Sequence, residues 1–172
     1  MKKTLITLFT IFIISMSANA QEKVIKLNPV GLLFGTGKIT FENVSSASNS
    51  TEVSLTYSSL DLGIFGKSTG IGGATKYKFY LSKEKIAPKG LYLAPEISYN
   101  NTKYKSGNVD FGLSVYGGGL LFGHQWILFG DDNGLAIDLN FGAGYYIVDI
   151  KGPATYGDGI LPKGNLSFGY AF

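Results

Sequence analysis

The sequence contains no cysteine and no arginine, and both absences narrow the chemistry that it can perform. Without cysteine there is no disulfide, no thiolate nucleophile and no lipid attached to an N-terminal cysteine. All 15 basic residues are lysine, so the chain lacks the bidentate guanidinium that proteins normally use to bind phosphate and nucleic acid. We therefore expect no nucleic-acid partner and a fold that is stabilised without covalent cross-links.

Histidine occurs once, as His124, and this restricts catalytic and metal sites. One histidine without cysteine cannot build a transition-metal centre unless scattered carboxylates contribute, and the G-x-S-x-G nucleophile motif is absent. The glycine runs at 70–73 and 117–119 lie inside strand-like patterns with no helix after them, so they are not phosphate-binding loops. We predict no cofactor, no metal site and no catalytic residue. A lipid-modifying enzyme that uses His124 remains an alternative.

Long apolar runs are also scarce, and the one near the start belongs to an export signal. Residues 1–3 are Met-Lys-Lys, an apolar run follows at 5–16, and Ala-Asn-Ala stands at 18–20. This order is typical of a secretory signal peptide. It predicts cleavage after residue 20, which leaves one domain at 21–172. No other stretch approaches the roughly 18 uninterrupted apolar residues of a membrane helix.

Glycine, aromatic residues and strict alternation are what the sequence has in abundance. It contains 24 Gly, 11 Tyr and 12 Phe, a composition typical of a strongly curved β architecture. The segment 134–150, GLAIDLNFGAGYYIVDI, places aliphatic and aromatic residues on one face. Asp138, Asn140 and glycines fall on the other face. This period of two indicates a strand, and its length exceeds the roughly 9–11 residues that a tilted strand needs to cross a membrane.

The same alternation recurs along the chain and predicts eight strands. Phase slips predict a bulge at 58–59 and an irregularity at 117–119, and polar composition predicts loops at 101–108 and 151–162. An even strand number places both ends of a single-chain bacterial barrel on the same side of the membrane. We therefore predict an all-β fold, an eight-stranded antiparallel transmembrane β-barrel with up-and-down meander topology. Its strands are expected at 23–35, 38–44, 52–65, 71–82, 90–101, 109–129, 134–150 and 163–172.

Three features favour a membrane barrel over a soluble, lipocalin-like ligand-binding barrel, in which the two faces would be exchanged. The polar face is rich in glycine and small residues, which suits a narrow interior. The chain also ends on alternating aromatic residues. The apolar face carries large side chains, with aromatic residues near strand ends as in an interfacial girdle: Tyr57, Tyr99, Trp126, Tyr145 and Tyr170. The soluble barrel remains an alternative.

If the apolar face meets lipid, the polar residues of the strands point inward. The interior of an eight-stranded barrel is only wide enough to be filled by side chains, and an unpaired buried charge is costly. We therefore predict a paired, structural polar plug rather than the remaining alternative, a narrow pore. Glu96 is expected to approach Lys76 or Lys78 across a hairpin. The predicted interior network comprises Lys38, Glu42, Lys76, Lys78, Glu96, Asp138, Asn140 and Lys163.

The C-terminal stretch LSFGYAF resembles the terminal strand by which the barrel assembly machinery of the outer membrane recognises its substrates. The segments NPVGLLFG, KGLYLAPEISY, GGGLLFGHQWIL and GLAIDLNFGAGYY resemble small outer-membrane β-barrel proteins of Bacteroidota, a domain-of-unknown-function family. The resemblance implies export to the cell outer membrane, contact with its lipid and an assembly signal at Phe168, Tyr170 and Phe172. We expect a structural or interaction role in the cell envelope.

Overall fold

The computed structural model describes residues 23–61, 66–81, 86–106, 109–130, 133–151 and 155–172. The expected signal peptide at 1–20 lies outside these residues. The one described helix is too short to cross a membrane. The elements are, in order, β1 (Lys23–Leu27), α2 (Pro29–Leu33), β2 (Thr36–Ser46), β3 (Asn49–Asp61), β4 (Lys67–Tyr80), β5 (Gly90–Ser106), β6 (Val109–Leu128), β7 (Gly134–Lys151) and β8 (Thr155–Ala171).

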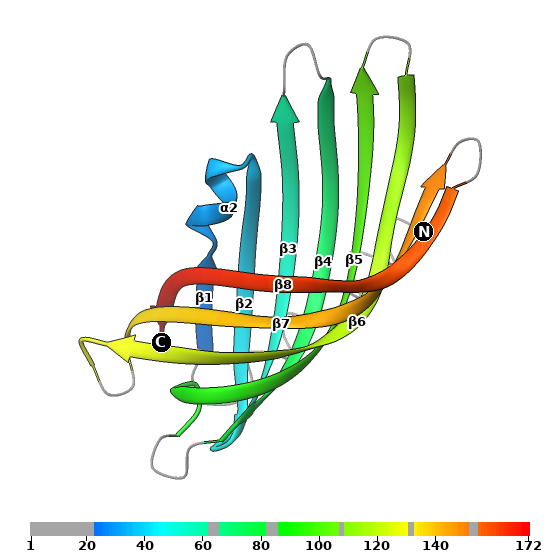
Figure 1. The fold of residues 1–172 in the computed structure, drawn as a ribbon. Helices are drawn as coiled ribbons and strands as arrows, with labels where there is room; N and C mark the ends of the chain where they lie inside the picture. Colours follow the sequence, from blue (N-terminus) through cyan, green and yellow to red (C-terminus); the bar gives the residue numbers. More distant parts are fainter. Residues whose placement is uncertain (1–22, 62–65, 82–85, 107–108, 131–132, 152–154) are drawn as a thin grey trace, which may run out of the picture.

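The eight strands form a closed antiparallel barrel in which each strand pairs with its neighbours in sequence (Figure 1). This confirms the expected all-β fold, strand number and meander topology. β1 closes the ring against β8, from Val24 opposite Ala171 to Leu27 opposite Phe168. Two further backbone hydrogen bonds of 2.9 Å join Lys23 and Phe172 in both directions. The two described ends of the chain therefore lie side by side at one end of the barrel.

Alternation along the strands separates a polar inner face from an apolar outer face. In β2 the inward residues Thr40 and Glu42 are buried, whereas Ile39 between Lys38 and Thr40 points outward and is exposed. Large outward side chains are far more exposed than is usual for apolar residues, for example Ile97 at 69 %. The outer surface also carries every aromatic residue expected in the girdle, namely Tyr57, Tyr99, Trp126, Tyr145 and Tyr170. Apolar residues outside and charges inside are the reverse of a water-soluble arrangement.

The first expected strand, 23–35, is wrong beyond Leu27, because a short helix follows β1. Asn28 is the N-cap of α2, and its side chain accepts a hydrogen bond of 2.7 Å from the Gly31 N–H. Pro29 then occupies the first helical turn, where its missing N–H costs nothing. Asn-Pro is thus a helix start here, and the helix takes the place of the upper half of β1 (Figure 1).

The two expected irregularities, at 58–59 and at 117–119, are absent. β3 pairs with β4 in one unbroken register from Asn49 opposite Phe79 to Asp61 opposite Lys67. β6 likewise pairs through its glycines without a shift on either side. The apparent slip in β3 came from Leu60, which has the inward phase but lies near the strand end and is 37 % exposed. A register shift does occur in the β2–β3 hairpin, where it lies between Val44 and Ser46.

The two expected loops, 101–108 and 151–162, are also mostly wrong. β5 continues to Ser106, β6 begins at Val109, and β8 begins at Thr155. Polar residues in these stretches alternate within paired strands instead of reversing the chain. The polar stretch at 101–106 is the end of β5, which rises beside β3, β4 and β6 in the tall hairpins of Figure 1.

Candidate functional site

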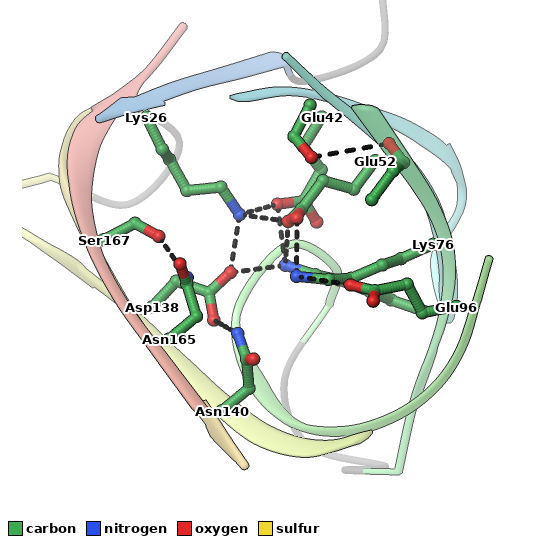
Figure 2. Close-up of polar contacts among 12 residues, drawn as sticks. Lys26, Glu42, Glu52, Lys76, Glu96, Asp138, Asn140, Asn165 and Ser167 are labelled. Atoms are coloured by element: carbon green, nitrogen blue, oxygen red, sulfur yellow. Dashed lines mark hydrogen bonds and ion pairs between the residues drawn. The ribbon is translucent and has the colours of Figure 1, made fainter. Parts of the chain in front are cut away.

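The interior of the barrel gathers most of the residues predicted to form a polar network. Lys38 and Lys163 are only partly buried. The other predicted members are buried inside and converge from different strands (Figure 2). They are Glu42, Lys76, Lys78, Glu96, Asp138 and Asn140.

Two lysines form the centre of the network and share the same acceptor atoms. Lys26 Nζ lies 2.7 Å from Glu42 Oε2, 2.7 Å from Glu52 Oε2 and 2.6 Å from Asp138 Oδ2. Lys78 Nζ lies 3.0, 3.1 and 2.7 Å from those same three oxygens. Both ammonium groups also donate to Gln125 Oε1, at 3.0 and 2.9 Å. The result is a compact cluster in which each cation contacts three carboxylates.

A second chain of ion pairs leads away from this cluster. Lys76 Nζ contacts Glu52 Oε1 at 2.8 Å and Glu96 Oε2 at 3.8 Å, and Glu96 lies directly opposite Lys76 in the register. The expected approach of Glu96 to Lys76 is confirmed. The other oxygen of Glu96 is paired with Lys163. The four lysines of the two groups, Lys26, Lys76, Lys78 and Lys163, thus balance the four carboxylates.

Hydroxyl and amide donors add to the coordination of two of the carboxylates, Glu42 and Asp138. Glu42 Oε1 accepts from Tyr80 Oη at 2.7 Å and from Ser50 Oγ at 2.5 Å. Asp138 Oδ1 accepts from Tyr92 Oη at 2.5 Å and from Asn140 Nδ2 at 3.2 Å. Hydrogen bonds to ionised groups are stronger than neutral ones, so these donors help the lysines to hold the two carboxylates in place. Every strand supplies at least one charged or amide side chain to the network.

Three of the carboxylates, Glu42, Glu52 and Asp138, offer oxygens within 4.8 Å of one another, which is close enough to hold a cation. Glu42 and Glu52 also stand directly opposite each other in the β2–β3 register, where like charges repel. Lys26 lies between them and contacts both, which offsets their repulsion. The ammonium groups of Lys26 and Lys78 therefore occupy the position that a metal ion would need.

Gly123 leaves the space that lets a large ring cross the interior. A Cβ at this position would lie 2.5 Å from Tyr92 Cζ and Oη and 2.8 Å from Asn140 Cβ. Tyr92, directly opposite Gly123, is fully buried and reaches Asp138 across that space. The Lys78 ammonium lies 4.4 Å from the Tyr92 ring centroid, a cation–π contact. Interior glycine therefore serves packing at this position.

An apolar layer closes the barrel on the side of the chain ends. Val24, Ala136 and Ala171 have no exposed surface and cluster with Ile127. A neighbouring cluster joins Val44, Tyr80, Ala87, Tyr92, Ala94 and Leu121. These layers and the ion pairs fill the described interior from the chain ends up to Glu96.

Beyond the ion pairs the interior widens into a polar vestibule. The vestibule is a cavity of about 210 Å³ lined by Asn28, Lys38, Thr56, Asn100, Lys163 and Asn165, together with small residues. Lys38 Nζ donates to Asn165 Oδ1 at 3.4 Å and forms no ion pair with any described residue. Asn28 Nδ2 donates to the same oxygen at 2.7 Å. The vestibule therefore holds one lysine charge that the network does not neutralise.

His124 lies on the outer face, away from the network. Its ring packs on Trp126 with centroids 4.2 Å apart, and the residues directly opposite it are Leu91 and Leu139. The expected assembly residues Phe168, Tyr170 and Phe172 are exposed at the closing end of the barrel. Phe168 and Tyr170 belong to the β1–β8 closure.

Sequence reasoning missed six members of the network: Lys26, Ser50, Glu52, Tyr80, Tyr92 and Gln125. Lys26 was hidden because the helix start after β1 blurred the phase of the first strand. The expected strand at 52–65 puts Glu52 at its first position, whereas β3 already begins at Asn49. Tyr80, Tyr92 and Gln125 had the inward phase on their strands, and phase alone was the signal that could have found them.

No protein-family model, curated protein or solved structure matches this chain.

Proposed function

We propose that this chain is an integral β-barrel protein of a bacterial outer membrane with a structural or interaction role in the cell envelope and no catalytic activity. The observation that carries the proposal is the inversion of its surfaces. Large apolar side chains such as Leu55, Ile97 and Phe141 are at least 60 % exposed, while four lysines and four carboxylates lie inside. A lipid environment makes both faces favourable, and water does not.

The height of the apolar belt supports the same proposal. On β6, Tyr116 and Trp126 both face outward at the two ends of the belt. Their separation along the strand matches the roughly 9–11 residues that a tilted strand uses to cross the hydrocarbon core. Aromatic residues at those two levels fit the headgroup regions. We propose that outer-membrane lipid is the immediate partner, and that the assembly machinery binds the C-terminal strand during biogenesis.

A structural role suits the interior better than transport or catalysis does. The fully buried Lys26, Lys78 and Tyr92 occupy the centre of the barrel, where a pore would need water. Trp126 packs on the ring of His124, and Leu91 and Leu139 lie opposite it in the sheet, a setting that suits packing on the outer face better than catalysis. The exposed belt also disfavours a soluble, ligand-carrying barrel.

Single-cysteine labelling tests the membrane location, and the absence of native cysteine keeps the background low. Leu139→Cys and Ile97→Cys place a thiol in the apolar belt, and Lys103→Cys places one on the polar extension of β5. In outer-membrane vesicles, a membrane-impermeant maleimide should label Lys103→Cys and leave both belt variants unlabelled until the membrane is dissolved. Labelling of all three at equal rates would overturn the proposal.

A further inference from the structure

The wall of the barrel has one seam that is not made of paired strands. β1 pairs with β8 only from Val24 to Leu27, so the described part of β8 from 157 to 167 has no strand partner on that side. Helix α2 lies in this seam and contacts both β2 and β8. Its apolar side chains Leu32 and Leu33 are 60 % and 83 % exposed. In a bilayer an unpaired strand edge is costly, because its backbone N–H and C=O groups have no water to bond. The seam is therefore a position in the wall where a further molecule could cover the edge.

An apolar groove runs along the outer surface beside the seam. We call it the seam groove. Its volume is about 310 Å³, and it is lined by Leu27, Asn28, Leu32, Gly37, Lys38, Ile39, Leu55, Thr56, Tyr57 and Ile71. Lys38, Asn28 and Thr56 also line the polar vestibule inside the barrel. The apolar groove and the polar cavity thus meet at the same three residues.

The charge at this meeting point is unbalanced. Lys38 is the lysine of the described interior that forms no ion pair, whereas the other four lysines contact the four carboxylates and are balanced by them. Asn28 and Asn165 beside it supply amide groups and no charge. A ligand with a single negative charge would balance the single positive charge of Lys38. A phosphate monoester would bring roughly −1.5 to −2 and would exceed it. A carboxylate has the charge that fits.

We propose that the seam binds a single-chain amphiphile with a carboxylate head, such as a fatty acid. Its carboxylate pairs with Lys38 at the vestibule, and its chain lies in the seam groove against Leu32, Ile39 and Leu55. The inference rests on the proposed membrane location, because the groove receives its ligand from lipid. It assigns to this barrel a lateral binding site that a purely structural role does not require.

A second groove on the same surface provides an internal comparison. It has a volume of about 430 Å³ and lies over β3, β4 and β5, with Leu55, Ile97 and Tyr99 around Gly73. None of its lining residues is charged. An apolar chain that binds without head-group recognition should therefore enter either groove. Selective binding of a carboxylate should occur only at the seam groove.

Photolabelling of the folded protein in zwitterionic-lipid nanodiscs tests the proposal, with a dodecanoic acid that carries a diazirine near its methyl end. We expect saturable labelling of residues that line the seam groove, displaced by dodecanoate and not by dodecanol. Lys38→Gln should raise the dodecanoate concentration needed for displacement about tenfold, as loss of a charge-assisted contact predicts. The control Lys103→Gln, on an exposed lysine of β5, should leave that concentration unchanged.

A second variant tests the groove itself without touching the charge. A Cβ at Gly37 would meet only Leu32 Cδ2 at 3.7 Å and Tyr57 O at 3.9 Å, which is ordinary contact. Because Gly37 lines the seam groove, the side chain of Gly37→Leu should project into it. This variant should abolish labelling there. Equal labelling of both grooves, equal displacement by the alcohol, or wild-type behaviour of both variants would overturn the inference.

Vesicle flotation, measured first, separates this inference from the proposed function. A chain that floats with lipid but shows no selective dodecanoate binding overturns the lateral site and leaves the membrane proposal standing. A chain that does not float overturns the membrane proposal and the lateral site with it.

Discussion

Asp138 is the residue on which most of the interior depends, because its two oxygens contact both central lysines, a tyrosine and an amide. Asp138→Asn keeps the shape of the side chain but removes one of the three negative charges that Lys26 and Lys78 share. We expect a loss of about 3–5 kcal/mol in the free energy of unfolding, the cost of stranding buried charge. The measurement is the unfolding temperature, taken as the temperature at which the folded form disappears on gels of progressively heated samples. It should fall below that of the wild type.

The matched control for that prediction is an ion pair at the surface. Lys105 Nζ lies 3.3 Å from Asp110 Oδ2, with side chains 69 % and 61 % exposed. Asp110→Asn should change stability by less than about 1 kcal/mol, because water screens the pair. If Asp138→Asn and Asp110→Asn unfold at the same temperature as the wild type, the interior is hydrated and the plug is wrong.

Glu52 offers a test of charge balance rather than of a single contact. It contacts Lys26 at 2.7 Å, Lys76 at 2.8 Å and Lys78 at 3.1 Å. Glu52→Gln should destabilise the barrel by about 3–5 kcal/mol, and adding Lys76→Met should recover part of that loss because a stranded ammonium is removed as well. Strictly additive effects of the two substitutions in urea unfolding would contradict the network.

At the scale of the element, packing against β6 depends on Gly123, which has no side chain and leaves space for the ring of Tyr92. Gly123→Ala places a methyl group 2.5 Å from the Tyr92 ring and 2.8 Å from Asn140. Because Tyr92 must move, its bond to Asp138 should lengthen, at a cost of about 1–3 kcal/mol from overpacking. Gly157→Ala is the control, since nothing lies within 4 Å of its added carbon. A shift in the unfolding midpoint of equal size in both variants would rule out the packing role.

The closing strand pair gives a prediction about assembly. Deleting residues 170–172 removes the pairs that Ala171 and Tyr170 make with Val24 and Ile25, which is half of the β1–β8 register. It also removes the double hydrogen bond between Phe172 and Lys23. We expect export to continue while insertion fails, so that the chain accumulates in the periplasm and is degraded. Fractionation followed by immunoblotting measures this. Normal amounts in the outer membrane would contradict both the closure and the expected assembly signal.

The elements also show what the sequence could and could not predict. Alternation was sufficient for the number of strands and for the inward phase of residues such as Glu42 and Asp138, because side-chain direction is local to each strand. It was not sufficient for the ends of β1, β5 and β8. Lys26 escaped because Asn28 and Pro29 form a helix start that resembles a blurred strand. The contact between Lys26 and Asp138 depends on barrel closure, which brings β1 to β7 across the interior. That is a property of the whole ring and has no signature in either segment.

For the whole molecule, the layers along the axis determine what can pass through it. Apolar residues close the end near the chain termini, ion pairs fill the middle, and the polar vestibule lies beyond them. Because one end is closed and the centre is filled, the described interior forms a cavity at one end and no continuous channel. Every strand contributes side chains to the interior network, so local opening of one hairpin breaks only part of that network.

The last prediction follows from this closed centre. The purified wild-type protein, inserted into a planar bilayer, should show no steady conductance, because Lys26, Lys78 and Tyr92 leave no exposed surface in the middle of the barrel. The double variant Tyr80→Ala with Tyr92→Ala removes two rings whose centroids lie 5.6 Å apart and which hold Glu42 and Asp138 in place. Water should then reach the ion pairs and weaken them, since screening reduces the attraction between charges. We expect brief current steps from the variant and none from the wild type. Steady conductance of the wild-type monomer would mean that the ion pairs open at rest, and the barrel would then be a pore.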